Sequence, residues 1–82
     1  MSPSDEEIDA MLLALAEERG PGATFCPSEA ARRLSEDWRP LMPAVRARGA
    51  LLQAGGRLRC TQKGVDVDPL EARGPIRFGA AG

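Results

Sequence analysis

Residues 27–53 have the sequence PSEAARRLSEDWRPLMPAVRARGALLQ, which predicts two helices joined by a tight polar turn. The first helix runs roughly from Pro27 to Leu34, since proline is tolerated in a first helical turn, and Glu29 is placed where a capping residue could reach back. Residues 35–37 close it. A short helix, a tight turn and a longer helix form the outline of a helix-turn-helix.

The second of these helices begins near Pro40 or Pro43 and continues to Gln53, because proline is not tolerated in a helix interior. Helical spacing places Leu41, Val45 and Leu52 on one side, flanked by Ala44 and Leu51, and predicts that this side is buried. The opposite side carries Pro43, Arg46, Ala50 and Gln53. Arg48 falls on the apolar side, so it either extends to the helix edge or pairs with an acid.

A third helix is expected before this stretch, from Ser4 to about Arg19. Ser4 can cap it, and acids at positions 5–7 suit the positive end of its dipole. The apolar residues then repeat at i, i+3, i+4 and i+7, which lines one face toward the core; they are Ile8, Met11, Leu12 and Leu15. Gly20-Pro21-Gly22 ends this helix.

Strands are expected on either side of the helix pair. Residues 23–26 are a short β-prone segment, and residues 57–63 alternate, with Leu58 and Cys60 facing one way and Arg57, Arg59, Thr61 and Lys63 the other. Ile76 and Phe78 suit a partner strand. Between them, residues 68–74 have the capping Asp, the Pro and the Gly of a single helical turn. Residues 79–82 are expected to be frayed.

The order of these elements predicts an α+β fold of the winged-helix type, a helix-turn-helix with a β-hairpin wing. We expect one domain over residues 1–82, with an ordered core at about 4–78, three helices and a two- or three-stranded antiparallel sheet.

Several longer motifs point to a particular family. Residues 37–46 (DWRPLMPAVR), 61–64 (TQKG), 68–69 (DP) and 72–77 (ARGPIR) resemble the bacterial family known as domain of unknown function 3253. The resemblance covers most of the chain. It implies a winged-helix fold and no established activity.

Composition limits the classes of function. The 82 residues include two cysteines and no histidine, so a structural zinc site, which needs four such ligands, is excluded, and we expect no metal and no cofactor. The acidic start does not fit a secretory signal, and no segment approaches the roughly 20 apolar residues of a membrane span. We therefore expect a cytoplasmic protein with no membrane partner. There, Cys26 and Cys60 are expected to be reduced core residues rather than a disulfide.

The net charge of −1 conceals an uneven distribution. Residues 1–31 carry seven acids and one arginine, a net −6, whereas residues 32–82 carry ten bases and five acids, a net +5. Such a split is typical of a chain with one polyanion-binding half. Ten of the eleven bases are arginine, however, which GC-rich coding DNA alone can produce.

The first functional hypothesis is therefore a double-stranded DNA-binding module, with transcriptional regulation as one role. The second helix of a helix-turn-helix enters the major groove, where Arg pairs with guanine and Gln with adenine. Base edges would be read by Arg39, Arg46 and Gln53, and phosphates held by Arg57, Arg59, Lys63, Arg73 and Arg77. Against this, the wing segment 63–73 has a net charge of −1, which a phosphate backbone would repel.

The alternative is a protein-interaction or dimerisation module that binds no DNA, because so small a domain gains from a protein partner or a second copy of itself. Trp38 and Met42 would anchor such a contact if exposed, although core packing is the competing role for Trp38.

An enzyme is not expected, since His and Tyr are absent and no nucleophile lies beside a base in a recognisable motif. Cys26 is the single candidate for a reactive group, because a helix start would favour its thiolate unless burial prevents reaction.

Overall fold

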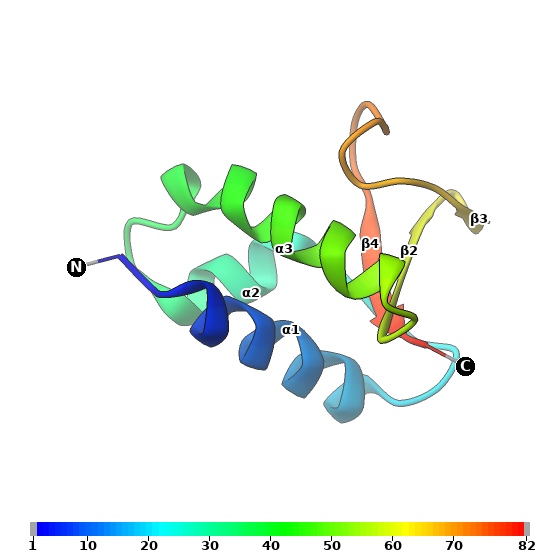
Figure 1. Cartoon of the computed structure of the whole chain (residues 1–82), viewed down its shortest axis with the longest axis horizontal. Helices are drawn as coiled ribbons and strands as arrows, with labels where there is room; N and C mark the ends of the chain where they lie inside the picture. The colour runs from blue at the N-terminus through cyan, green and yellow to red at the C-terminus, as the bar shows by residue number, and fades with distance from the viewer. Residues whose placement is uncertain (1, 82) are drawn as a thin grey trace.

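The computed structural model describes residues 2–81, in which three α-helices cover one face of an antiparallel sheet (Figure 1). The order of elements is the one expected for a winged helix. The elements are α1 (Asp5–Arg19), β1 (Thr24–Phe25), α2 (Pro27–Leu34), a short 3-10 helix η1 (Arg39–Leu41), α3 (Met42–Ala54), β2 (Leu58–Gln62), β3 (Val65–Asp66) and β4 (Arg77–Ala80).

Helix α1 begins as its sequence predicts. The Ser4 hydroxyl accepts from the backbone N–H of Glu7 at 3.1 Å, and the Glu7 carboxylate accepts from the backbone N–H of Ser4 at 3.0 Å, which forms a capping box. Gly20 ends the helix with φ +83°. The buried side chains of α1 are Ile8, Leu12, Leu15 and Ala16, whereas Met11 is only partly buried.

The helix pair also forms, with two differences from the prediction. Glu29 does not cap α2; its carboxylate accepts a hydrogen bond from Arg19 of α1 instead. In α3 the buried residues are Val45, Gly49 and Leu52, whereas Leu51 is 58% exposed, so the buried side is rotated away from Leu51.

The sheet has four antiparallel strands in the order β1-β4-β2-β3, whereas two or three strands were predicted. Phe25, Phe78 and Cys60 lie opposite one another across β1, β4 and β2, and all three are buried against the helices. The additional strand, β3, forms a tight hairpin with β2. Both residues of its turn, Lys63 and Gly64, have positive φ, as a type I′ turn requires.

The chain end was predicted incorrectly. Gly79 and Ala80 are not frayed: they belong to β4 and pair with Arg59 and Leu58 of β2, so the ordered core extends beyond residue 78. The strand at 57–63 is shorter than expected, because Arg57 precedes β2 and Lys63 lies in the hairpin turn. Gly82 lies outside the described residues.

One core holds these elements together. The rings of Phe25 and Phe78 meet at a centroid distance of 6.1 Å with a 53° tilt. Around them lie apolar side chains from the helices and the sheet, namely Ile8, Leu12, Leu15, Ala30, Ala31, Val45, Leu52, Leu58, Cys60 and Ile76. The core therefore fixes which side of each helix remains available for other contacts.

Candidate functional site

Helix α3 lies very close to the sheet, because it carries a glycine at the point of contact. A Cβ atom added at Gly49 would lie 2.2 Å from Cζ of Phe78, far inside van der Waals contact. The glycine therefore lets the aromatic ring of β4 pack directly on the helix backbone. The sequence pattern gave no sign of this role, since Gly49 interrupts the apolar stripe.

Arg46 and Gln53, two of the three predicted base-reading residues, do not extend freely into solvent. Arg46 donates to the carbonyl oxygens of Pro69 at 3.3 Å, Ala72 at 3.4 Å and Gly74 at 2.8 Å. Gln53 donates from Nε2 to the Val67 carbonyl at 2.7 Å. Both side chains are half-buried. They hold the segment 67–74 against α3, a contact we call the wing latch.

The segment in the latch has its own local order. The Asp68 carboxylate accepts from the Leu70 N–H at 2.8 Å, and the Asp68 carbonyl accepts from the Ala72 N–H at 2.9 Å, which gives the expected single helical turn. The side chain of Pro69 is fully buried, whereas Leu70 beside it is 65% exposed. The latch therefore joins an ordered turn to α3.

Arg39, the third predicted base-reading residue, lies in η1, between α2 and α3. Its guanidinium carbon is 4.7 Å from the centroid of the Trp38 ring, and that of Arg32 is 4.6 Å from the same centroid. Trp38 is partly buried and packs against the core, which agrees with core packing and not with an exposed contact anchor. Both arginines are exposed.

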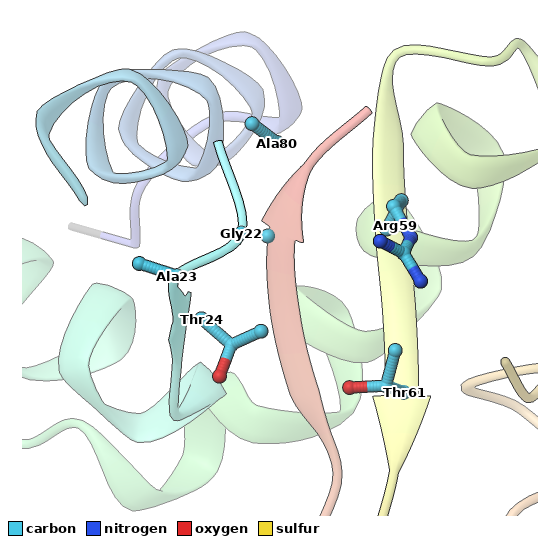
Figure 2. Close-up of a pocket in the computed structure, with 7 residues that line it drawn as sticks. Gly22, Ala23, Thr24, Arg59, Thr61 and Ala80 are labelled. Atoms are coloured by element: carbon cyan, nitrogen blue, oxygen red, sulfur yellow. The ribbon is translucent and has the colours of Figure 1, made fainter. Parts of the chain in front are cut away.

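The three bases expected on the outer face of the sheet have different environments. Arg57 and Lys63 are exposed, one before β2 and one in the hairpin turn. Arg59 pairs with Asp66 of β3 at 3.0 Å. Figure 2 shows Arg59 and Thr61 on the same side of the sheet as Thr24, across β4, around a notch of about 30 Å³, room for a water or two. Thr61 is only 8% exposed, because Arg77 and Asp66 lie opposite it in the adjacent strands.

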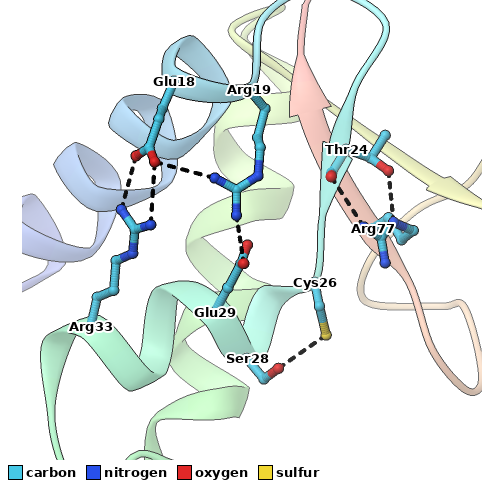
Figure 3. A network of polar contacts seen from close by, with 8 residues as sticks. All are labelled: Glu18, Arg19, Thr24, Cys26, Ser28, Glu29, Arg33 and Arg77. Carbon is cyan, nitrogen blue, oxygen red and sulfur yellow. Dashed lines mark hydrogen bonds and ion pairs between the residues drawn. The ribbon is translucent and has the colours of Figure 1, made fainter.

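The last two predicted residues lie near the start of β4. Arg77 donates from Nε to the Thr24 hydroxyl at 2.6 Å and from Nη2 to the Thr24 carbonyl at 3.1 Å, which ties β4 to β1 (Figure 3). The side chain of Arg73 is exposed, and its carbonyl accepts a hydrogen bond from Gln62.

The eight predicted residues therefore do not form one assembled surface. Arg46 and Gln53 hold the latch, Arg59 and Arg77 have partners within the sheet, and Arg39 and Arg57 lie at opposite ends of α3. A 13-residue helix is about 20 Å long, so Arg39 and Arg57 would need separate phosphate groups.

What α3 does present to solvent is an uncharged surface. Between the latch on one side and α1 on the other, the exposed and half-exposed side chains of this helix are small or apolar; they are Pro43, Ala47, Ala50, Leu51 and Ala54. We call this surface the outer α3 face. None of its side chains can donate or accept a hydrogen bond.

Three of the six acids of α1, Asp5, Asp9 and Glu18, pair with arginines from later in the chain. Arg48 donates to both oxygens of Asp9, at 2.9 and 2.8 Å, which decides between the two alternatives left open for it. This bidentate hydrogen bond lowers the pKa of the Asp9 carboxyl below its ordinary value of 3.8. Figure 3 shows the pairs Arg33–Glu18 and Arg19–Glu29 between α1 and α2.

The two cysteines differ in environment, and no disulfide joins them. Cys60 is buried as expected, and burial raises the pKa of its thiol to about 11. Cys26 was expected in the core but is exposed at the start of α2, with its sulfur 3.1 Å from the Ser28 hydroxyl (Figure 3).

Within residues 2–81 no cluster of three or more His, Cys, Asp or Glu side chains could hold a metal ion. None of the helices in that range has the length and apolar composition needed to cross a membrane.

The fold and these contacts define a small α+β domain of three helices and a four-stranded antiparallel sheet, with the segment 67–74 latched to α3. The chain belongs to the family of proteins of unknown function DUF3253, whose model matches residues 5–81, as the motifs at 37–46 and 72–77 suggested. No curated protein matches the chain.

Proposed function

We propose that this domain is a protein-interaction module whose contact surface is the outer α3 face, and that its partner is a second copy of the chain. One observation carries the proposal. The side of α3 that a DNA-reading helix would turn toward the groove has no charged or hydrogen-bonding side chain, while Arg46 and Gln53 donate to the wing. A surface of that chemistry suits an apolar partner.

A second copy fits this surface for two reasons. In a two-fold dimer the same patch meets itself, so an uncharged patch avoids the repulsion that a charged one would create. Three alanines on the face allow two helices to approach closely. In an antiparallel pair, Glu36 and Asp37 before α3 would also lie near Arg57 after α3 of the other copy.

Sedimentation equilibrium tests the proposal. Over protomer concentrations from about 10 µM to about 1 mM, which span weak interfaces, the average mass should rise toward that of a dimer. Leu51→Glu should remain monomeric, because it places a charge on the outer α3 face. Val65→Glu is the matched control, since Val65 is 64% exposed on β3, away from this face, and Leu51 is 58% exposed.

Two results would count against the proposal. A mass that stays monomeric over the whole range removes the dimer. Equal loss of association in Leu51→Glu and Val65→Glu moves the contact away from α3.

Duplex DNA is a second candidate partner, favoured by a different observation. Six exposed bases have no carboxylate within 4 Å among residues 2–81. One of them, Arg77, bonds to Thr24, and the other five are Arg32, Arg39, Arg57, Lys63 and Arg73. Bases without partners are available to phosphates. We therefore keep double-stranded DNA as a candidate partner, contacted through its phosphates and without Arg46 and Gln53 as base readers.

A titration of labelled duplex at about 50 and 200 mM salt tests this second candidate. Affinity should fall steeply with salt and should weaken in Arg39→Ala and Arg57→Ala, while Leu51→Glu should leave it unchanged. Absent or salt-insensitive binding eliminates DNA as the partner.

A further inference from the structure

A groove separate from the outer α3 face lies where β1 passes into α2. It has a volume of about 310 Å³ and crosses the beginning of β4 to reach the β2–β3 turn. Its lining residues come from three parts of the chain and are Cys26, Gln62, Lys63, Pro75, Ile76 and Arg77. This volume lies in the range of small-molecule sites.

The apolar part of the groove is held in place by a side-chain amide. Gln62 donates from Nε2 to the carbonyl oxygens of Arg73 and, at 3.1 Å, Pro75. These bonds fix the segment before β4 against the end of β2. Ile76 is only 1% exposed and anchors this segment in the core, while Pro75 is exposed beside it. The wall therefore does not depend on a flexible loop.

The charged part of the groove is wholly positive. The charged residues of its lining are Lys63 and Arg77, and the lining contains no Asp or Glu. The Nε and Nη2 atoms of Arg77 bond to Thr24, which orients the guanidinium and leaves Nη1 without a protein partner in the described part of the chain. Lys63 is exposed in the hairpin turn and forms no ion pair with residues 2–81. Two cations beside an apolar wall are complementary to an anion that carries an apolar group.

We propose that this groove binds a small organic oxyanion. Its charged end pairs with Lys63 and Arg77, and its apolar body lies against Pro75, which is exposed beside the buried Ile76. The site is independent of the proposed dimer contact, because none of its lining residues belongs to the outer α3 face.

Titrations followed by amide NMR test this proposal on the full chain. Benzoate and phenyl phosphate serve as probes for the carboxylate and phosphate forms, benzyl alcohol as the neutral analogue, and inorganic phosphate as the charge without an apolar body. Saturable shifts are expected for at least one of the two aromatic anions, centred on the Gln62 side-chain amide and the backbone of Cys26 and Arg77. The tighter binder of the two shows whether the groove prefers a carboxylate or a phosphate.

Substitutions assign the charge to its residues. Lys63→Gln should weaken anion binding about two- to fivefold, as for removal of one exposed ion pair. Arg73→Gln, which removes an exposed base outside the lining, should leave the affinity unchanged. Arg77→Lys should retain more affinity than Arg77→Gln, and because Arg77 also binds Thr24, the spectrum of each variant must first show an intact fold.

Three outcomes overturn the proposal. They are no saturable shift with either aromatic anion, equal affinity for benzyl alcohol, and equal affinity for inorganic phosphate and phenyl phosphate. The first removes the site, the second removes the role of the cations, and the third removes the role of the apolar wall.

Cys26 provides a second readout, because it lines the groove while the other thiol, Cys60, is buried. Its sulfur displaces iodide from iodoacetate, an anion, or from iodoacetamide, its neutral counterpart. Relative to a free cysteine in solution, Cys26 should favour iodoacetate, and Lys63→Gln should reduce that preference. A ratio equal to that of free cysteine contradicts a positive groove.

Discussion

The contact between Gly49 and Phe78 sets how closely α3 approaches the sheet, and it gives a sharp test at one residue. In a helix interior, alanine is favoured over glycine by about 1 kcal/mol. Gly49→Ala should nonetheless destabilise the protein by about 1 to 3 kcal/mol, because the new Cβ would overlap the Phe78 ring. Urea denaturation measures the difference.

Gly55→Ala is the matched control, since a Cβ there would meet only backbone oxygens at 3.6 and 3.7 Å. A neutral or stabilising Gly49→Ala would show that the helix and the ring are not packed as described.

The ion pair between Asp9 and Arg48 makes stability depend on pH in a definite direction. Folding lowers the pKa of the Asp9 carboxyl below 3.8, mainly through its hydrogen bonds with Arg48, so near that pH the unfolded chain binds more protons. The stabilisation is therefore present above about pH 3.8 and is lost as the pH falls through the lower folded pKa. Asp9→Asn should be less stable than the natural protein at pH 7, with a difference that shrinks below pH 3.8.

Thermal denaturation between pH 2 and pH 7 measures this difference. Glu17→Gln changes an exposed acid without an ion pair among residues 2–81. Its melting temperature should follow that of the natural protein across this pH range. A constant difference between Asp9→Asn and the natural protein would contradict the lowered pKa.

Individual side-chain roles were the least predictable feature. Periodicity placed Arg46 on the outward side of its helix, but it could not show that the segment 67–74 returns to meet that side. It left Arg48 undecided for the same reason, because Asp9 lies 39 positions earlier. Contacts between residues far apart in sequence leave no local pattern.

The wing latch can be tested at the level of the element that it holds. Arg46→Met keeps most of the apolar stem and removes the bonds to Pro69, Ala72 and Gly74. We expect a loss of about 1 to 2 kcal/mol of stability, the scale of a charge-assisted hydrogen bond. Hydrogen exchange should accelerate selectively at the amides of Glu71 and Ala72, which close the turn.

Arg57→Ala removes an exposed arginine whose side chain has no such partners in the described part of the chain and should change stability by less than about 0.5 kcal/mol. Unchanged exchange at Glu71 and Ala72 in Arg46→Met would show that the turn does not depend on α3.

Elements with strong local signals were predicted well, and elements defined by pairing were not. Helix α1 has both an apolar repeat and a capping box, and both are present. Strand β3 is two exposed residues long, and Gly79 and Ala80 become a strand only because β2 lies beside them. Such short segments have no periodicity of their own.

On the scale of the whole molecule, the uneven charge of the sequence is partly neutralised by folding. Acids of the first 31 residues meet Arg33 and Arg48 from the basic part, and Arg19 joins Glu29 to α1. The periodicity of the sequence predicted the fold class. The charge count did not predict where the bases lie, because folding pairs some of them with acids and separates others.

The two contact regions that we propose differ in their surface chemistry. The outer α3 face is uncharged, and the groove at Lys63 and Arg77 is positive. A partner chain and a small anion could therefore bind the same molecule without competing. Leu51→Glu should accordingly leave anion binding unchanged.

Amide NMR spectra recorded as the protein is concentrated test the role of the outer α3 face most directly. Shift changes should centre on Ala47, Ala50, Leu51 and Ala54, and Leu51→Glu should abolish them. Spectra that do not change with concentration, or changes centred on the β2–β3 hairpin, would contradict the proposal.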